Sequence, residues 1–223
     1  MTNNRQFIFR ADGNAKIGMG HIMRCLTIAD GLSALVDRSN ISFICADKES
    51  AKVAADRGYN STAFGTDYRD MNAELTAWNK LELKDSVIIV DSYFINNNYL
   101  EGLSVYGKVI ILDDMQQETF FADVVFNYNV FADGKTYEKL YEGRDTILCL
   151  GAEYVPVRPQ FASVDYSALP VVKNVFITTG GGDVDNIAGQ LYECMGKARE
   201  DLHYHLISGR FNPHFEKLKI LEA

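Results

Sequence analysis

A strand, a glycine-bearing loop and a helix follow one another within residues 7–32, and no other feature constrains the fold as strongly. Phe7–Phe9 is a short apolar run, Gly18 and Gly20 lie in a polar loop, and His21 stands in the first turn of the predicted helix. Glycine lets the backbone approach a ligand closely, and the free N–H groups of a helix start suit an anion. The segment therefore predicts the first strand–loop–helix unit of an α/β fold, with a phosphorylated ligand bound at the loop.

Strands and helices continue to alternate after this unit. Continuously apolar runs such as Val87–Val90 are typical of parallel strands buried on both faces. Strands are predicted at Phe7–Arg10, Ile41–Ala46, Val87–Val90, Val109–Leu112, Val124–Phe126 and Ile147–Cys149. Helices are predicted at Gly20–Val36, Ala51–Arg57, Met71–Leu81 and Leu100–Val105. This succession predicts a Rossmann-like, doubly wound parallel sheet over residues 1–150.

A second α/β pattern begins after a proline-rich stretch. Residues 151–170 contain three of the four prolines and are predicted to be a linker. The pattern then restarts with strand Val171–Thr178, helix Ile187–Arg199 and strand His203–Ile207, and Asn212-Pro213 starts a further helix. Two strands and two helices cannot cover both faces of an open sheet. We therefore expect residues 171–223 to be the truncated beginning of a second domain, covered by a continuation of the chain or by a second copy.

Composition narrows the class of partner. The formal net charge is -8 and the pI about 5.0, which argues against nucleic acid as the main partner. A nucleotide ligand stays open, because backbone N–H groups and a few cations can hold a diphosphate. The four cysteines form no CxxC pair, which favours a reduced cytoplasm over a disulfide or metal framework. Neither a signal pattern nor an apolar run of ~18 residues indicates secretion or a membrane span.

His21 is the candidate catalytic group. A histidine at a helix start often only caps the helix or packs against it. This one, however, directly follows Gly18-x-Gly20 at the carboxyl end of the first strand, where open α/β sheets bind ligands. The positive end of the helix dipole favours a neutral imidazole that can accept a proton. His21 is therefore predicted to act as a general base.

Charged residues flank the same loop. Arg10 and Asp12 precede it and Arg24 lies one turn after His21, so they either brace the loop as ion pairs or bind substrate. The loop lacks the third glycine of the dinucleotide fingerprint, which disfavours NAD. No cofactor is predicted.

Further polar residues follow two buried strands. Asp91, Ser92 and Tyr93 come after Val87–Val90, and Asp113-Asp114 comes after the next apolar strand. Carboxylates at strand ends brace turns, and several at one sheet edge could also orient His21 or bind sugar hydroxyls. Their spacing does not specify a magnesium site, so no metal is predicted.

The second unit has a glycine loop of its own. Gly180-Gly181-Gly182-Asp183 stands between a strand and a helix, where consecutive glycines either form a flexible turn or expose N–H groups to an anion. Two such loops suggest a cleft between two domains, one of which holds phosphates while the other supplies chemistry.

These residues resemble a known family. The pattern Arg10-x-Asp12 … Ile17-Gly18-x-Gly20-His21-x-x-Arg24 is similar to the signature of the pseudaminic-acid pathway nucleotide-sugar hydrolases and of related spore-coat polysaccharide biosynthesis proteins. Further matches are Val90-Asp91-Ser92-Tyr93, Leu112-Asp113-Asp114, Asn127-Tyr128-Asn129, Tyr154-x-Pro156-x-Arg158 and Thr179-Gly180-Gly181-Gly182-Asp183 … Asn186.

The resemblance implies a glycosyltransferase-B-like fold that holds UDP mainly in its C-terminal domain. It implies that His21 deprotonates a water that attacks the anomeric carbon of a UDP-linked diacetamido-trideoxy sugar and expels UDP with inversion, without a metal. The implied substrate-binding residues are Arg10, Asp12, Gly18, Gly20, Arg24, Asp91, Tyr93, Arg158, Gly180, Gly181, Gly182, Asp183 and Asn186.

Two alternatives to the hydrolase stay open. A glycosyltransferase on the same scaffold would pass the sugar to an acceptor other than water. A fragment that binds a nucleotide sugar without turning it over would fit the early end of the second domain, because that family's second domain continues well beyond this length.

Overall fold

A computed structural model describes residues 5–116, 118–161, 163, 167–195, 201–209 and 211–220. The chain divides into two compact units. The first comprises the described residues up to Gly13 together with Gly20–Arg158, and the second comprises Asn14–Met19 and the described residues from Pro159 onward. The domain boundaries drawn from the sequence at residues 150 and 170 stay a prediction.

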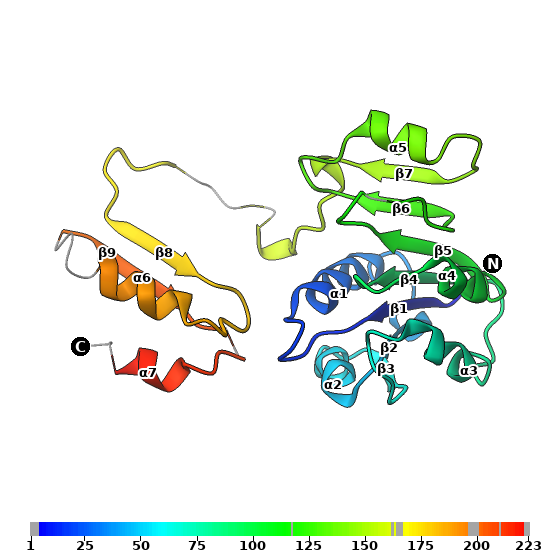
Figure 1. The fold of residues 1–223 in the computed structure, drawn as a ribbon, viewed down its shortest axis with the longest axis horizontal. Helices are drawn as coiled ribbons and strands as arrows, with labels where there is room; N and C mark the ends of the chain where they lie inside the picture. The colour runs from blue at the N-terminus through cyan, green and yellow to red at the C-terminus, as the bar shows by residue number, and fades with distance from the viewer. Residues whose placement is uncertain are drawn as a thin grey trace. The chain divides into compact units, whose positions relative to one another are not determined.

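The first unit is a seven-stranded parallel sheet with helices packed along it (Figure 1). The strand order is β3-β2-β1-β4-β5-β6-β7, and every neighbouring pair is parallel. The strands are β1 (Phe7–Ala11), β2 (Ile41–Cys45), β3 (Asn60–Ala63), β4 (Ser86–Asp91), β5 (Gly107–Leu112), β6 (Val124–Asn127) and β7 (Ile147–Leu150). The order reverses between β1 and β4, so the carboxyl ends of these strands form the switch point at which open α/β sheets bind ligands.

Helices and short 3-10 turns connect these strands. They are α1 (Gly20–Leu32), η1 (Arg38–Asn40), α2 (Lys48–Asp56), η2 (Met71–Glu74), α3 (Leu75–Trp78), α4 (Asn97–Ser104), α5 (Gly134–Leu140) and η3 (Ala152–Tyr154). Local capping explains where several of them start. The side chain of Asp47 accepts a hydrogen bond from Ser50 N at the start of α2, and Asn96 does the same from Tyr99 N at the start of α4.

Alternate residues of the central strands make one continuous core. Ile8, Ile88, Val90 and Ile111 are fully or almost fully buried and lie in one cluster with large side chains from the helices. Those helical side chains are Trp78, Tyr99, Leu100, Leu103, Tyr137 and Tyr141. A rigid sheet results, and its strand ends hold the polar groups described below.

The second unit is smaller. Its described strands, β8 (Asn174–Thr178) and β9 (His203–Ile207), form a parallel pair in which Phe176 is the partner of His205. The turn η4 (Pro159–Phe161) and the helices α6 (Ile187–Met195) and α7 (Phe215–Lys219) belong to the same unit.

The predicted α/β class and the Rossmann-like parallel sheet are confirmed, while several elements differ in detail. The first helix ends at Leu32 rather than Val36, and the helix expected at Met71–Leu81 is a 3-10 turn followed by a single α-helical turn. β3 and α5 were not predicted from the sequence. β3 is a polar edge strand whose residues are half-buried or exposed, so it lacks the apolar run that marks the inner strands.

The remaining differences concern the second unit, where the helix predicted to start at Asn212-Pro213 begins at Phe215. Strand β8 begins at Asn174 rather than Val171, and residues 196–199 of the predicted helix Ile187–Arg199 lie outside the described part. No helix within the described ranges is long and apolar enough to cross a membrane.

Candidate active site

The first unit contains a cavity of about 370 Å³ next to the start of α1 and the carboxyl ends of β4 and β5. That volume lies within the range of about 300–1,000 Å³ typical of small-ligand pockets. Its charged and titratable lining comprises His21, Arg24, Asp91, Asp113, Asp114 and Glu118. The cavity therefore lies at the topological position where the sequence predicts a ligand.

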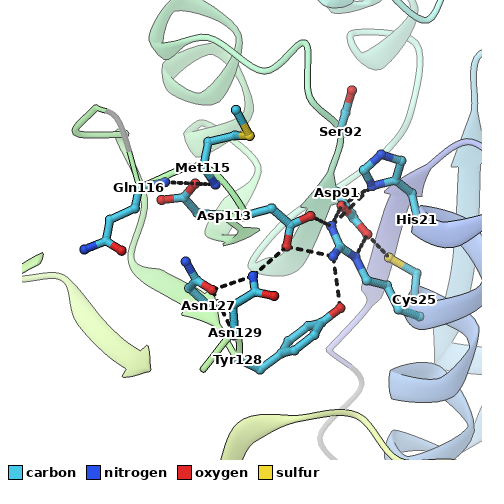
Figure 2. A network of polar contacts seen from close by, with 12 residues as sticks. His21, Cys25, Asp91, Ser92, Asp113, Met115, Gln116, Asn127, Tyr128 and Asn129 are labelled. Atoms are coloured by element: carbon cyan, nitrogen blue, oxygen red, sulfur yellow. Dashed lines mark hydrogen bonds and ion pairs between the residues drawn. The ribbon is translucent and has the colours of Figure 1, made fainter. Parts of the chain in front are cut away.

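His21 forms a close pair with Asp91. Its Nδ1 lies 2.7 Å from Asp91 Oδ1. In the neutral ring, a hydrogen that Nδ1 donates to the Asp91 carboxylate leaves Nε2 with its lone pair. Arg24 Nη2 also lies 3.2 Å from Nδ1. The ring lines the cavity although only 8% of the residue is exposed, and Figure 2 shows its second nitrogen on the side away from Asp91. A neutral imidazole held in this way can accept a proton at Nε2.

Asp91 is ionised in spite of its burial. Burial would raise the pKa of this carboxyl, but hydrogen bonds from Arg24 and His21 outweigh burial and hold the pKa below its ordinary value. The side chain is fully buried as the last residue of β4, in register with Ala11 of β1. Asp91 thus supplies a fixed negative charge directly behind the imidazole.

Arg24 connects Asp91 with the neighbouring strand end. Its Nε and Nη2 each lie 2.5 Å from an oxygen of Asp91, while Nη1 and Nη2 lie 2.9 and 2.8 Å from the two oxygens of Asp114. Nη1 also donates to the hydroxyl of Tyr128 at 3.0 Å. Every nitrogen of the guanidinium therefore has a protein partner. Burial would lower the pKa of Arg24, but these bonds raise it above its ordinary value.

A second layer of polar contacts holds Asp113 and Asp114 in place (Figure 2). Asp113 accepts from Met115 N and Gln116 N, and Tyr137 Oη donates to it at 2.6 Å. Asn129 Nδ2 lies 3.3 Å from Asp114. The Asp113 carboxylate thus fixes the loop that follows β5, whereas the Asp114 carboxylate turns toward Arg24.

The rest of the cavity wall is aromatic and apolar. The ring of Tyr93 stands edge-on to His21 with the centroids 4.5 Å apart, and 63% of Tyr93 is exposed. Ile95, Leu112, Met115 and Phe120 line the same cavity. A ligand that has both apolar and polar groups can contact this wall and the carboxylates at the same time.

Two residues predicted to bind substrate lie elsewhere. Arg10 and Asp12 are buried, with 0% and 3% exposed, and neither lines the cavity of His21. Arg10 donates through Nε and Nη2 to Glu74 at 2.7 and 2.5 Å and through Nη1 to Asp12 at 2.6 Å. Asp12 also accepts from Ala46 N at 2.7 Å. The structure thus places this pair in the bracing arrangement that the sequence left as an alternative.

The first glycine loop has a turn of its own. Gly18 N donates to Asn14 O at 2.9 Å, and Gly18 has φ +78°, a conformation that disfavours any residue with a side chain. Gly20 opens α1, and among the described residues no atom beyond its chain neighbours and the helix backbone lies within 4 Å of where a Cβ would stand. Gly18 is therefore required by the turn, whereas the protein leaves space beside Gly20.

The second glycine loop ends in a helix cap. Gly180 has φ +79°. The Asp183 carboxylate accepts from Ile187 N at 2.7 Å and from Ala188 N at 3.1 Å, so it uses the first N–H groups of α6. Gly181 and Gly182 lie between these two residues. Asp183 therefore occupies the helix start that the sequence assigned to an anion.

Buried polar atoms without a partner gather near this loop. Thr179 Oγ1, Asn186 Oδ1, Ser208 Oγ and Asn212 Nδ2 form no hydrogen bond within the described ranges. Thr179 and Ser208 directly follow β8 and β9, so this edge is again the carboxyl end of parallel strands. Buried polar groups nearly always find a partner, which makes this edge a candidate ligand contact.

Arg158 is exposed at the end of the first unit and does not line the cavity of His21. In the part of the chain that the structure describes, no group of three or more His, Cys, Asp or Glu side chains is arranged to hold a metal ion. The predicted list of site residues lacks Asp114, Tyr128 and Glu118. The strand-end pattern points to the first two, since Tyr128 directly follows β6, whereas nothing local singles out Glu118.

Fold and site together define an α/β protein with a Rossmann-like parallel sheet and a histidine–aspartate pair at its switch point. No protein-family model matches the chain. It is 25% identical over 214 residues to the UDP-2,4-diacetamido-2,4,6-trideoxy-beta-L-altropyranose hydrolase of Campylobacter jejuni. The match covers 95% of this chain and 72% of that protein. It is 24% identical over 205 residues to the uncharacterized protein MJ1062 of Methanocaldococcus jannaschii.

The two relatives differ in length. The match to the Methanocaldococcus protein covers 89% of this chain but only 41% of that protein, so the chain spans less than half of the relative. Both are distant homologues, and one of them is named as a hydrolase of a UDP-linked sugar.

Proposed function

We propose that this chain is a nucleotide-sugar hydrolase that cleaves the anomeric C–O bond of a UDP-linked diacetamido-trideoxy sugar. The observation that carries the proposal is the 2.7 Å contact from His21 Nδ1 to Asp91. It leaves Nε2 of the neutral ring to accept a proton at a ligand-sized cavity. The distant similarity to the Campylobacter hydrolase supports the choice of substrate.

In the proposed reaction, His21 Nε2 removes a proton from a water molecule as the water oxygen forms its bond to the anomeric carbon. The bond from that carbon to the diphosphate oxygen breaks, and its electron pair leaves with UDP. The sugar is released with inverted configuration, and the imidazole returns its proton to solvent. A single base suffices because a nucleoside diphosphate is already a good leaving group, so no acid partner is needed.

We also propose which residues contact the sugar ring and which contact the diphosphate. Every nitrogen of Arg24 contacts a protein partner, so we propose that the cavity receives the sugar ring and that Tyr93 contacts it. The loop Gly180–Gly182 stays the proposed contact of the diphosphate, supported by the unpartnered polar atoms near it. Arg10 and Asp12 are proposed to support the strand end rather than to touch substrate.

Two histidine variants test whether His21 acts as the base. His21→Gln keeps a polar side chain but cannot accept the proton, so UDP release from the diacetamido-trideoxy substrate should fall about 10²–10⁴-fold. The matched control is His203→Gln, because His203 is exposed on β9 and has no part in the proposed reaction. Turnover that persists in His21→Gln, with unchanged circular dichroism, contradicts the mechanism.

An isotope experiment tests the bond and the acceptor. In water enriched in oxygen-18, C–O cleavage places the label on the released sugar, whereas P–O cleavage places it on UDP. Mass spectrometry of both products distinguishes them. Label in UDP, or UDP release only when a second sugar or alcohol is added, contradicts hydrolysis at carbon and favours a transferase.

A further inference from the structure

The guanidinium of Arg24 is held between two carboxylates, and only one of them contacts the histidine. Asp91 accepts from both His21 and Arg24, while Asp114 accepts from Arg24 at 2.8 and 2.9 Å. Arg24 needs only one carboxylate to balance its charge. The second therefore leaves an excess of negative charge beside the ring.

The charges of these four groups can be counted. Asp91 and Asp114 contribute two negative charges and Arg24 one positive charge, so the set carries one negative charge while His21 is neutral. When His21 takes a proton, the sum becomes zero. Because the side chains of Arg24 and Asp114 are only 15% and 20% exposed, solvent screens these charges less than it would on an open surface.

We propose that Asp114 is a positioning residue of the hydrolase: it holds Arg24 against Asp91 and supplies the negative charge that the protonated His21 neutralises. This inference rests on the proposed function, because it assigns a role in the proton transfer to a side chain that does not contact the ring. Without Asp114, the pair of Asp91 and Arg24 is neutral, and a proton on His21 adds an unbalanced positive charge.

The titratable groups around His21 include the three already counted and several more. They are Arg24 and Cys25 of α1, Asp91 and Tyr93 at the end of β4, Asp113, Asp114 and Glu118 after β5, and Tyr128 after β6. Asp113 is used by Tyr137 and by two backbone N–H groups, so its carboxylate does not contact Arg24. Glu118 lines the cavity, and no described bond joins it to Arg24.

Glu118 therefore offers a matched control for Asp114. Asp114→Asn and Glu118→Gln each replace one carboxylate of the same cavity by its amide, with almost no change in shape. Only the first removes charge from the set that includes His21. Asp114→Ser serves as a second variant should the asparagine form fold poorly.

The first measurement needs no turnover. Proton NMR of the ligand-free chain follows the imidazole signals against pH, with His21 assigned by its loss in His21→Gln. Removing a negative charge disfavours the protonated ring, so the titration midpoint of His21 should fall by about one pH unit in Asp114→Asn. It should stay within a few tenths of a unit in Glu118→Gln. An unmoved midpoint in both Asp114 variants overturns the proposal.

The second measurement follows UDP release against pH. In Asp114→Asn the acid limb of kcat should move to lower pH by the same amount, and the plateau should fall several-fold because the base is weaker. A merely structural role would lower the rate at every pH without moving the limb. An equal shift in Glu118→Gln would also overturn the proposal. If His21→Gln keeps its turnover, the proposed function fails, while the NMR titration still tests the charge set.

Discussion

The first unit contains two arginines that are each held between two carboxylates, and they differ in what surrounds them. Arg10 is bound by Glu74 and Asp12, and Arg24 by Asp91 and Asp114. Arg10 is fully buried, whereas Arg24 lines a cavity. The local chemistry is the same, so the difference in use has to come from the neighbours.

The neighbours of Arg10 complete a closed network. Tyr99 Oη donates to Glu74 at 3.0 Å, Trp78 Nε1 donates to Tyr99 Oη at 3.0 Å, and Thr66 Oγ1 donates to Glu74 at 3.1 Å. The network links β1 to the helices that cover it, and none of its members named here is a histidine. The contacts of Arg24 instead include His21, and both residues line the cavity. The comparison teaches that a clamped arginine supports chemistry only where it is coupled to a base that a ligand can reach.

Breaking the Arg10 network should give the largest effect on stability. Glu74→Gln replaces one of the two Glu74 oxygens that accept from Arg10 by an NH2 group, while Asp12 still balances the charge. Losing this buried, charge-assisted hydrogen bond should cost about 3 kcal/mol of unfolding free energy. Urea denaturation measures the loss. Asp56→Asn is the matched control, because it breaks an exposed pair with Lys52 and should change stability little. If the two variants lose equal stability, the Arg10 network does not stabilise the fold more than an exposed ion pair does.

The partners of Arg10 also show where inference from the sequence ends. The parallel sheet could be predicted because short apolar runs such as Val87–Val90 carry the signal locally. The strand-end carboxylates could be predicted to gather, since parallel strands end at one edge. Glu74 could not be assigned to Arg10, which precedes it by 64 residues. Only the tertiary packing of η2 against β1 brings the two together.

The site shows the same boundary. The position of His21 after a glycine loop and the presence of Asp91 at a strand end predict a base and a carboxylate in one place. The contacts of Arg24 with Asp114 and Tyr128 depend on the paths of β5 and β6 and have no local signal. The same holds for the cap that Asp183 forms on α6, while its expected place near a phosphate stays a prediction.

The pH dependence of the unfolding free energy tests the network around Arg24, because Asp91 is one of its two carboxylates. The pKa of Asp91 lies below its ordinary value, so its contribution to stability is present above the unfolded pKa of about 3.9 and is lost as the pH falls through the lower, folded pKa. Asp91→Asn should cost about 2 kcal/mol at pH 7, the scale of a hydrogen bond to a charged group. Its stability should then decline less steeply than that of the parent below pH 4.

Unfolding free energies of the parent and of Asp91→Asn, measured between pH 3 and pH 7, check this expectation. If the two curves run parallel throughout, the ionised state of Asp91 is not linked to folding. That result would leave the pair of His21 and Asp91 as a contact without the electrostatic support proposed for the base.

The smallest effect comes from removing one hydroxyl in each region. Tyr128→Phe deletes the acceptor of one Arg24 N–H but keeps the ring, whose centroid lies 5.7 Å from the guanidinium carbon. Because that N–H lies at a cavity that water can enter, the loss should be about 1 kcal/mol or less. Tyr99→Phe leaves Trp78 Nε1 without its buried acceptor and removes one of the donors to Glu74, and should cost roughly twice as much. Urea denaturation of the two variants compares the regions directly, and a larger loss in Tyr128→Phe would reverse the assignment of the closed and the open network.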